Sequence, residues 1–137
     1  MRIRYLSENE VLLAHFVMMN KYDDKEQAGV KYLDKYQAML ARPQTSVFGE
    51  DAFPTLEDKA LCYLHSIASQ HIFHNGNKRT AATIFVLFLR MHGYDINLSN
   101  KELEDYMVMM VQDQKYKTND WLEQMKQDFE GRISKRG

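Results

Sequence analysis

Apolar residues recur at helical spacing in several segments of this chain, and short polar breaks separate those segments. The first segment begins at Ser7, which stands three residues before Glu10 in the arrangement of a capping box, and it extends to Lys21. Residues 22–24 (Tyr-Asp-Asp) predict a break. A second helix is expected over residues 25–40, where apolar side chains again recur near one face.

The pattern changes after Pro43, which prevents the second helix from continuing. Residues 45–48 include β-prone side chains, Gly49 favours a turn, and residues 53–54 favour extended backbone. We therefore expect a short loop or hairpin over residues 45–54, which we call the flap. It is either a plain connection between helices or a segment that lines a functional site.

Thr55 is a suitable N-cap for a third helix, which carries acidic residues in its first turn. One face of this helix is apolar and comprises Leu56, Ala60, Leu64, Ile67 and Ala68, with His71 at its end. His71 is therefore expected at the inward-facing end of an apolar stripe. Residues 73–76 predict a break, and a fourth helix is expected over residues 77–89, with Gly93 ending it. Because that helix is apolar on nearly every side, it is expected to be the central helix of a bundle.

The C-terminal part of the chain predicts two further helices. Ser99 and Glu102 form a second capping box, from which a helix should extend to about Gln112. Residues 118–120 favour the start of a last helix. The apolar face of that helix comprises Trp121, Leu122, Met125 and Phe129. The basic tail over residues 132–137 is expected to fray.

The length and composition of the chain are those of a folded domain. Its 137 residues suffice for one hydrophobic core, so the helical pattern predicts a single all-α domain over residues 1–137. Hydrophobic residues make up 45% and charged residues 27%, proportions that argue against a disordered chain. The formal net charge of −1 gives no electrostatic reason to expect direct DNA binding.

Cysteine content and hydropathy indicate where the protein is located. The single cysteine, Cys62, cannot form an internal disulfide, so a reducing cytoplasm is the simplest location. The charged start of the chain, residues 1–5, predicts no signal peptide. The longest apolar run, residues 81–89, is too short to span a bilayer, so no membrane association is expected.

Residues 71–79 combine the residue types that an anion-binding catalytic site needs. His71 precedes a turn that contains Gly76, and the next helix begins with two cations, Lys78 and Arg79. A helix N-terminus offers unpaired N–H groups and the positive end of a dipole, glycine lets backbone approach a ligand, and cations suit phosphate. A histidine beside such a site can accept a proton from an incoming hydroxyl. The segment therefore predicts phosphoryl or nucleotidyl transfer.

Residues 71–79 (His-Ile-Phe-His-Asn-Gly-Asn-Lys-Arg) resemble the signature of the Fic/Doc family, His-x-Phe-x-acid-Gly-Asn-x-Arg. Within residues 77–80, the lysine resembles the Doc branch, in which it replaces the glycine of Fic proteins. Residues 41–44 and 53–55 are also similar to Doc-family sequence around the flap. The resemblance implies a Fic-like helical bundle with a flap before the motif.

The resemblance also implies a role for each residue of the motif. His71 would be the general base, Phe73 would pack into the core and fix the loop, and Asn75 stands where the family often has an acid that holds Mg²⁺. The residues that would bind the phosphates of ATP are Gly76 and Asn77, as an anion nest, and Lys78 and Arg79, as cations.

For the Doc branch, the resemblance implies a kinase that uses ATP and Mg²⁺ to phosphorylate a Ser or Thr hydroxyl of a protein. It further implies elongation factor Tu as the target, arrest of translation, and a Phd-like antitoxin that covers the site. The chain is therefore expected to be the toxin of a type II toxin–antitoxin pair. Its flap would align a target segment by strand-like pairing.

Two departures from the family pattern keep alternatives open. Asn75 is neutral, and an amide oxygen binds Mg²⁺ more weakly than a carboxylate, so a weakly active chain that mainly binds an antitoxin is one alternative. Nucleotidyl transfer of the Fic type is the other, although Lys78 disfavours it and Ala82 stands where Fic enzymes place a second arginine. A zinc site is disfavoured, because His65 and His71 are six residues apart and would point in different directions on a helix.

Overall fold

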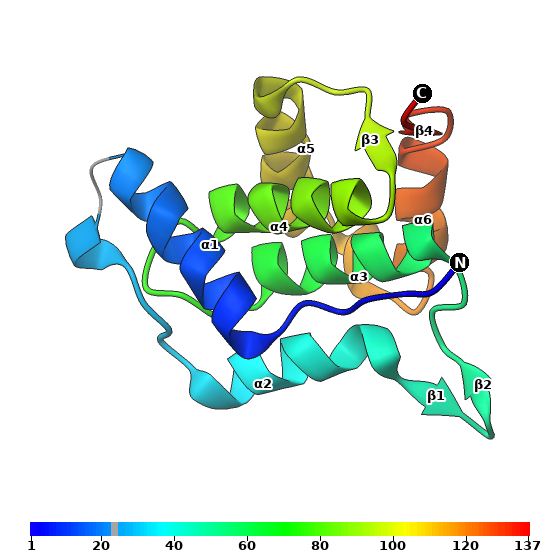
Figure 1. The fold of residues 1–137 in the computed structure, drawn as a ribbon, viewed down its shortest axis with the longest axis horizontal. Helices are drawn as coiled ribbons and strands as arrows, with labels where there is room; N and C mark the ends of the chain where they lie inside the picture. Colours follow the sequence, from blue (N-terminus) through cyan, green and yellow to red (C-terminus); the bar gives the residue numbers. More distant parts are fainter. Residues whose placement is uncertain (23–24) are drawn as a thin grey trace.

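The computed structural model describes residues 1–22 and 25–137, and within these ranges the chain forms six α-helices and two small antiparallel sheets (Figure 1). The helices are α1 (Glu8–Lys21), α2 (Leu33–Ala41), α3 (Leu56–Ser69), α4 (Asn77–Met91), α5 (Asn100–Gln112) and α6 (Trp121–Asp128). Short 3-10 helices are η1 (Lys25–Gln27), η2 (Arg42–Gln44) and η3 (Gln114–Lys117). The strands are β1 (Ser46–Val47), β2 (Glu50–Asp51), β3 (Tyr94–Ile96) and β4 (Ile133–Lys135). The all-α prediction is confirmed.

Local capping chemistry sets the start of three helices. The capping-box pairs are Ser7 with Glu10 in α1, Thr55 with Asp58 in α3, and Ser99 with Glu102 in α5. In each, the hydroxyl oxygen accepts a hydrogen bond from the backbone N–H three residues later, and the carboxylate accepts one from the cap residue. No helix in the described ranges combines the length and hydropathy that a membrane crossing requires.

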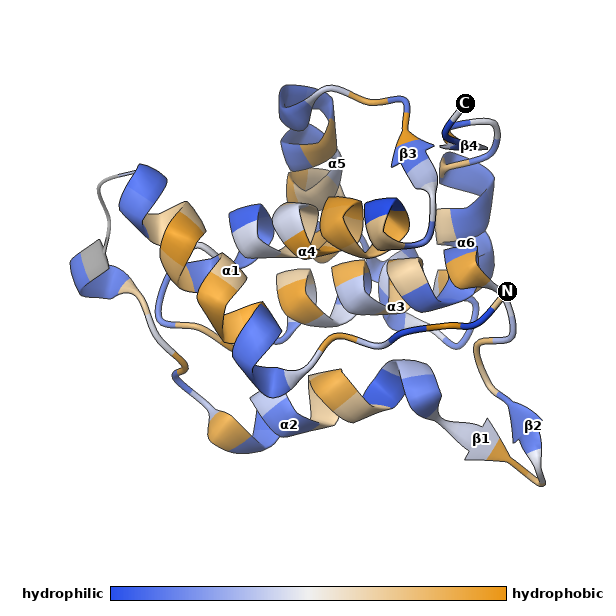
Figure 2. Ribbon diagram, in the orientation of Figure 1, coloured by the Kyte–Doolittle hydropathy of each residue, from blue (hydrophilic) through white to orange (hydrophobic). Residues whose placement is uncertain are grey.

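Helix α3 is the most enclosed of the described helices, and α4, the predicted central helix, packs along it and also contacts α1, α5 and β3. Every residue of α3 from Asp58 to Ala68 is buried, whereas α4 leaves Leu87 exposed. Apolar stretches of α1, α3 and α4 lie along this central region (Figure 2). The sequence made α3 look one-sided because it carries polar residues such as Lys59 and Ser66, which are buried here with hydrogen-bond partners.

The second predicted helix is much shorter than expected. Helix α2 begins only at Leu33, and the predicted residues 25–32 instead form η1 and an extended segment. Gly29 has a φ of 122°, and Val30 pairs with Phe73 in an isolated bridge. The backbone of this segment hydrogen-bonds to another part of the chain, which a helix would prevent. The predicted break at 22–24 is described only at Tyr22, since Asp23 and Asp24 lie outside the described residues.

The C-terminal tail is paired rather than frayed, which corrects the prediction for residues 132–137. Strand β4 pairs with β3 in antiparallel register, with Asp95 opposite Ser134. The Arg136 guanidinium lies 3.1 Å from the Asp95 carboxylate, and the backbone N–H of Arg136 donates to the Gly93 carbonyl at 2.8 Å. The basic tail therefore pairs with the edge of β3 and with the negative charge of Asp95. Neither partner can be predicted from the composition of the tail itself.

The flap is a hairpin of β1 and β2, in agreement with the expectation of a short loop or hairpin over residues 45–54. Gly49 has a φ of 81° at its turn, and the neighbouring Phe48 side chain is fully exposed. The base of the flap is tied to α3 by Lys59, whose ammonium donates to the Phe53 carbonyl and lies 3.6 Å from the Asp51 carboxylate. The flap is thus anchored at its base and open at its tip.

Candidate active site at the start of helix α4

The turn between α3 and α4 ends the first helix earlier than the sequence predicted. Helix α3 stops at Ser69, and His71 follows it with a φ of 52° and an exposed side chain. The prediction that His71 lies at the inward-facing end of the apolar stripe is therefore wrong. The left-handed conformation at His71 turns the chain so that Ile72 and Phe73 are buried in its place.

The segment 29–32 holds this turn from outside by backbone hydrogen bonds. The N–H groups of Lys31 and Tyr32 donate to the Ile72 carbonyl at 2.8 and 3.2 Å. The N–H of His74 donates to the Gly29 carbonyl at 3.0 Å. These bonds fix the backbone on both sides of Phe73 and leave His71 just outside the paired stretch.

Asn77 closes the turn from within. Its Oδ1 accepts a hydrogen bond from the Phe73 N–H at 2.9 Å, and its Nδ2 donates to the Phe73 carbonyl at 3.1 Å. The Asn75 Oδ1 accepts from the N–H of Gly76 at 2.8 Å. Since the side-chain amide of Asn77 is used in this way, only its backbone N–H is left to serve the anion nest that the motif implies.

Gly76 is required at its position for two physical reasons. Its φ of 71° is the left-handed conformation that favours glycine, and it directly precedes α4. A Cβ at this position would overlap the Sδ of Met19 and lie 3.2 Å from the Cε of Met18. The side chains of α1 therefore pack directly against the turn, and a side chain at residue 76 would require the buried Met19 side chain to move.

His15 of α1 supports the turn, a role that the sequence analysis missed. Its ring stacks on Phe73 with centroids 3.9 Å apart, and its Nε2 accepts from the Gly29 N–H at 2.9 Å. The proton is therefore assigned to Nδ1, which donates to the Thr80 Oγ1 at 2.9 Å. Burial lowers the pKa of His15 to about 4. Its helical spacing from the buried Val11 was a signal that could have indicated this burial.

The N-terminus of helix α4 is half-buried. Unlike α1, α3 and α5, this helix has no side-chain cap among the described residues, and Gly76 occupies its N-cap position. The first N–H groups of the helix and the positive end of its dipole are therefore directed at whatever binds there. Lys78 at this end opposes the dipole, and a bound anion would relieve that repulsion.

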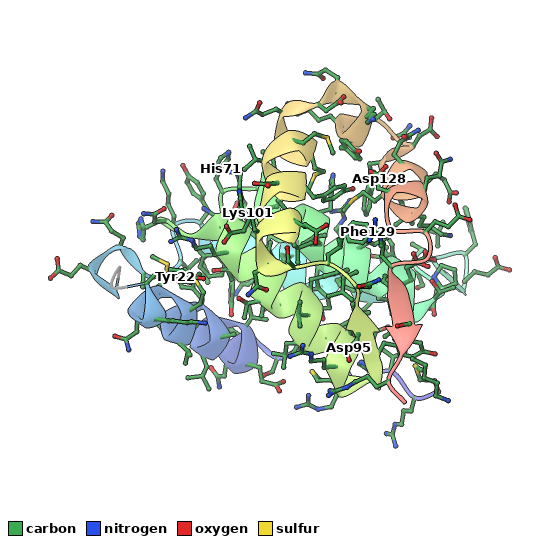
Figure 3. All side chains as sticks on the ribbon, turned by 90° about the horizontal axis from the view of Figure 1, so that it is seen from above. Tyr22, His71, Asp95, Lys101, Asp128 and Phe129 are labelled. Carbon is green, nitrogen blue, oxygen red and sulfur yellow. The ribbon has the colours of Figure 1, made fainter. Side chains whose placement is uncertain are left out.

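The structure places the two motif cations on different sides of α4, since consecutive helix residues point about 100° apart. Lys78 and His71 line one cavity of about 540 Å³. Arg79 lines a larger hollow of about 780 Å³ together with Ala82, and its guanidinium lies 4.3 Å from the ring centroid of Tyr22. His71 and Tyr22 lie on either side of the start of α4 (Figure 3).

The donor atoms near the motif suit an anion better than a metal ion. Among the described residues no three His, Cys, Asp or Glu side chains gather where they could hold a metal. Asn75 supplies one neutral oxygen, and that oxygen already accepts a hydrogen bond from Gly76. Because Mg²⁺ is usually held by one or two carboxylates together with substrate phosphates, these residues alone fit Mg²⁺ poorly.

A second buried histidine, His65, lines the same cavity as His71 and Lys78. The His65 Nε2 hydrogen-bonds to the Tyr116 carbonyl at 2.9 Å, and its ring stacks on Trp121 with centroids 4.1 Å apart. Burial, opposed by the bond to Tyr116 and aided by the charge of Arg42, lowers the pKa of His65 to about 4. His65 and His71 thus face one cavity, the first neutral and enclosed, the second exposed.

The fold and the site together define an all-α protein whose histidine-containing turn leads into a helix without a side-chain cap among the described residues. Residues 5–89 match the model of the Fic/DOC family, and the chain belongs to that family. It is 31% identical to Protein kinase doc of Escherichia phage P1 over 106 residues, 77% of this chain and 81% of that protein.

A second relative is similar over a shorter stretch. The chain is 46% identical to Toxin Doc of Mycolicibacterium smegmatis (strain ATCC 700084 / mc(2)155) over 59 residues, which are 43% of this chain. The match spans 45% of that relative's own length, so it covers less than half of the mycolicibacterial protein.

Replacing Gly76 by alanine should destabilise the protein more than the same change at Gly131. Both glycines have similar positive φ values of 71° and 76°, but a Cβ at Gly131 has no atom within 4 Å. The left-handed backbone should cost each variant about 1 kcal/mol, and the overlap with Met19 should cost Gly76→Ala about 1–3 kcal/mol more. Urea unfolding of the two variants measures the difference, and equal losses would refute the packing argument.

The free energy of unfolding should fall as the pH drops from about 7 to about 5. In this range His15 and His65 bind protons in the unfolded chain but not in the folded chain, where they are buried. Their folded pKa values of about 4 lie below the ordinary histidine value of 6.5, so this contribution to stability is full above pH 6.5 and is lost progressively as the pH falls towards 4. The expected loss over this range is about 2 kcal/mol per histidine. Urea unfolding at both pH values measures this loss. The free energy of unfolding of His15→Gln should depend less on pH than that of the unaltered protein. A profile identical to that of the unaltered protein would contradict the assignment.

Proposed function

We propose that this protein is a Doc-like toxin that transfers the γ-phosphate of ATP to a Ser or Thr hydroxyl of a target protein. The observation that carries the proposal is that His71 and Lys78 line one cavity beside the uncapped start of α4. A base, a cation and an oriented set of N–H groups are the parts that phosphoryl transfer needs.

In this mechanism each motif residue of the chain has one task. His71 accepts the proton of the target hydroxyl while the oxygen forms a bond to the γ-phosphorus and the bond to the bridging oxygen of ADP breaks. Lys78 and the first N–H groups of α4 stabilise the charge on the phosphate oxygens. Gly76, Asn77 and Phe73 keep the turn in shape.

The role of Arg79 is less direct than the motif implies. It lies 3.9 Å from the Glu104 carboxylate and against Tyr22, on the other side of α4 from His71. To contact a phosphate in the His71 cavity it would have to leave these partners. Lys78 is therefore the principal phosphate-binding cation in this proposal.

Mg²⁺ enters the proposal only through the nucleotide. The poor fit of Asn75 means that the phosphates of ATP would supply most of the oxygen ligands for the ion. When bound, the ion would neutralise phosphate charge, and no step above depends on it. The same poor fit favours the second candidate function, a weakly active chain that mainly binds its antitoxin.

The partners follow from the family and from the names of the relatives, one a toxin and one a protein kinase. We propose elongation factor Tu as the target, a Phd-like antitoxin as the inhibitor, and the cytoplasm as the location. The exposed tip of the flap, with Val47 and Phe48, offers an open edge on which a target segment could pair.

Label from the γ-phosphate of ATP, and not from the α-phosphate, should appear on protein in a bacterial lysate. His71→Ala should reduce the transfer at least about 10²-fold through loss of the base. His74→Ala is the matched control, because this exposed histidine of the same turn lies outside the cavity. Transfer of the α label would instead identify a nucleotidyltransferase, and no transfer of either label would favour the binding function.

Expression of the chain without an antitoxin should arrest bacterial growth, and His71→Ala should relieve the arrest while His74→Ala should not. Colony counts after induction measure both effects, with protein levels checked by immunoblot. Growth arrest that persists in His71→Ala at equal protein level would argue against a catalytic toxin.

A further inference from the structure

The cavity that His71 lines has a second cationic wall that the motif does not account for. Besides Lys78, its lining includes Arg42 of η2 and Lys117 of η3. No aspartate or glutamate of the described residues lines it, although acidic residues slightly outnumber basic ones in the chain. The described lining of the cavity thus carries three cationic side chains and no carboxylate in a protein whose net charge is nearly zero.

Arg42 is held in place while part of its guanidinium stays open. Its Nη1 donates to the Ser66 Oγ at 2.6 Å and lies 3.2 Å from the His65 Nδ1. Its guanidinium carbon lies 4.6 Å from the ring centroid of Trp121. Within residues 1–22 and 25–137, no hydrogen bond or ion pair engages its Nε or Nη2. A guanidinium has five N–H donors, so three of them point away from these contacts.

His65 acts as a neutral support for Arg42. Its Nε2 faces the Tyr116 carbonyl, which can only accept, so the proton belongs on Nε2 and the Nδ1 accepts from Arg42. The lowered pKa of His65 keeps it in this form at neutral pH. Neither of these two partners of Arg42 is an anion, so neither neutralises its positive charge.

The two cationic walls belong to one cavity, so a single ligand in it has access to both. Arg42 contacts α3 at His65 and Ser66, and α3 ends at Ser69, two residues before His71. From His65 to Ser69 the helix rises only about 6 Å. The cavity volume of about 540 Å³ lies in the range of ordinary small-molecule sites.

We propose that Arg42, assisted by Lys117, forms a second phosphate-binding position across the cavity from Lys78, so that the polyphosphate chain of a nucleotide is held between the two walls. This inference rests on the proposed function, since it takes the phosphate donor to bind in the His71 cavity. A guanidinium with an open fork suits phosphate oxygens, and the acid-free wall leaves it no competing partner. The opposing possibility is that Arg42 only joins η2 to α3 and Trp121.

Trp121 supplies a direct readout, because it is the single tryptophan of the chain and lies against Arg42 in the cavity. Selectively excited Trp121 fluorescence should change on titration with ATP and with inorganic triphosphate, and hardly at all with adenosine. An equal response to adenosine would show that the base, and not the phosphate chain, occupies the cavity, and would overturn the proposal.

Two variants test the cations separately. Arg42→Gln and Lys117→Gln should each weaken triphosphate binding about tenfold or more, since each removes a charge-assisted contact. Arg90→Gln is the matched control, because Arg90 is exposed and pairs with Asp95 away from the cavity. Lys117 is exposed, so its variant should fold normally and decides the question if Arg42→Gln does not fold. Unchanged affinity in every folded variant would overturn the proposal.

The binding experiment tests the second phosphate position and the transfer experiment tests the kinase activity, so one proposal can be refuted without the other. Triphosphate binding that depends on Arg42 and Lys117, without γ-label transfer, would leave the second phosphate position standing and remove the kinase. Transfer of the γ label with an unchanged KM for ATP in both variants would leave the kinase standing and remove the second phosphate position.

Discussion

The enclosure of Phe73 is the constraint on which the site depends. The backbone N–H and carbonyl of Phe73 both hydrogen-bond to the side-chain amide of Asn77. Its ring stacks on His15, and the residues on either side of it hydrogen-bond to the segment 29–32. The buried ring lies between two residues with left-handed backbone, His71 and Gly76, and this turn leaves the histidine exposed just before the start of α4. The position of the proposed base is thus a consequence of core packing two residues away.

The cations of the site lie at a position that the helix dipole disfavours. Lys78 and Arg79 stand at a helix N-terminus, where cations are unfavourable, and the helix has no side-chain cap among the described residues. Arg79 is compensated by Glu104 and Tyr22, whereas Lys78 faces a cavity that Arg42 makes more positive. An arrangement that costs stability in the free protein becomes favourable when a polyanion fills it.

Those features that rest on short-range chemistry could be predicted from the chain. The capping boxes at Ser7 and Ser99 need only a hydroxyl and a carboxylate three residues apart, and the hairpin at residues 45–54 needs only a turn glycine between β-prone residues. Features that depend on residues far away in the sequence could not be predicted from the chain. Residues 29–32 are extended because Ile72 and Phe73 offer them a backbone edge, and the tail is a strand because β3 does.

By itself the sequence determined the helical class, the family resemblance of residues 71–79, and the residue types available for phosphate chemistry. Only the tertiary structure decided which of them meet. It placed Lys78 with His71 and turned Arg79 away, because successive residues of a helix diverge by about 100°. It also brought Arg42, which stands 29 positions before His71 in the chain, to the same cavity. Arg42 is held there by contacts with α3 that no local pattern encodes.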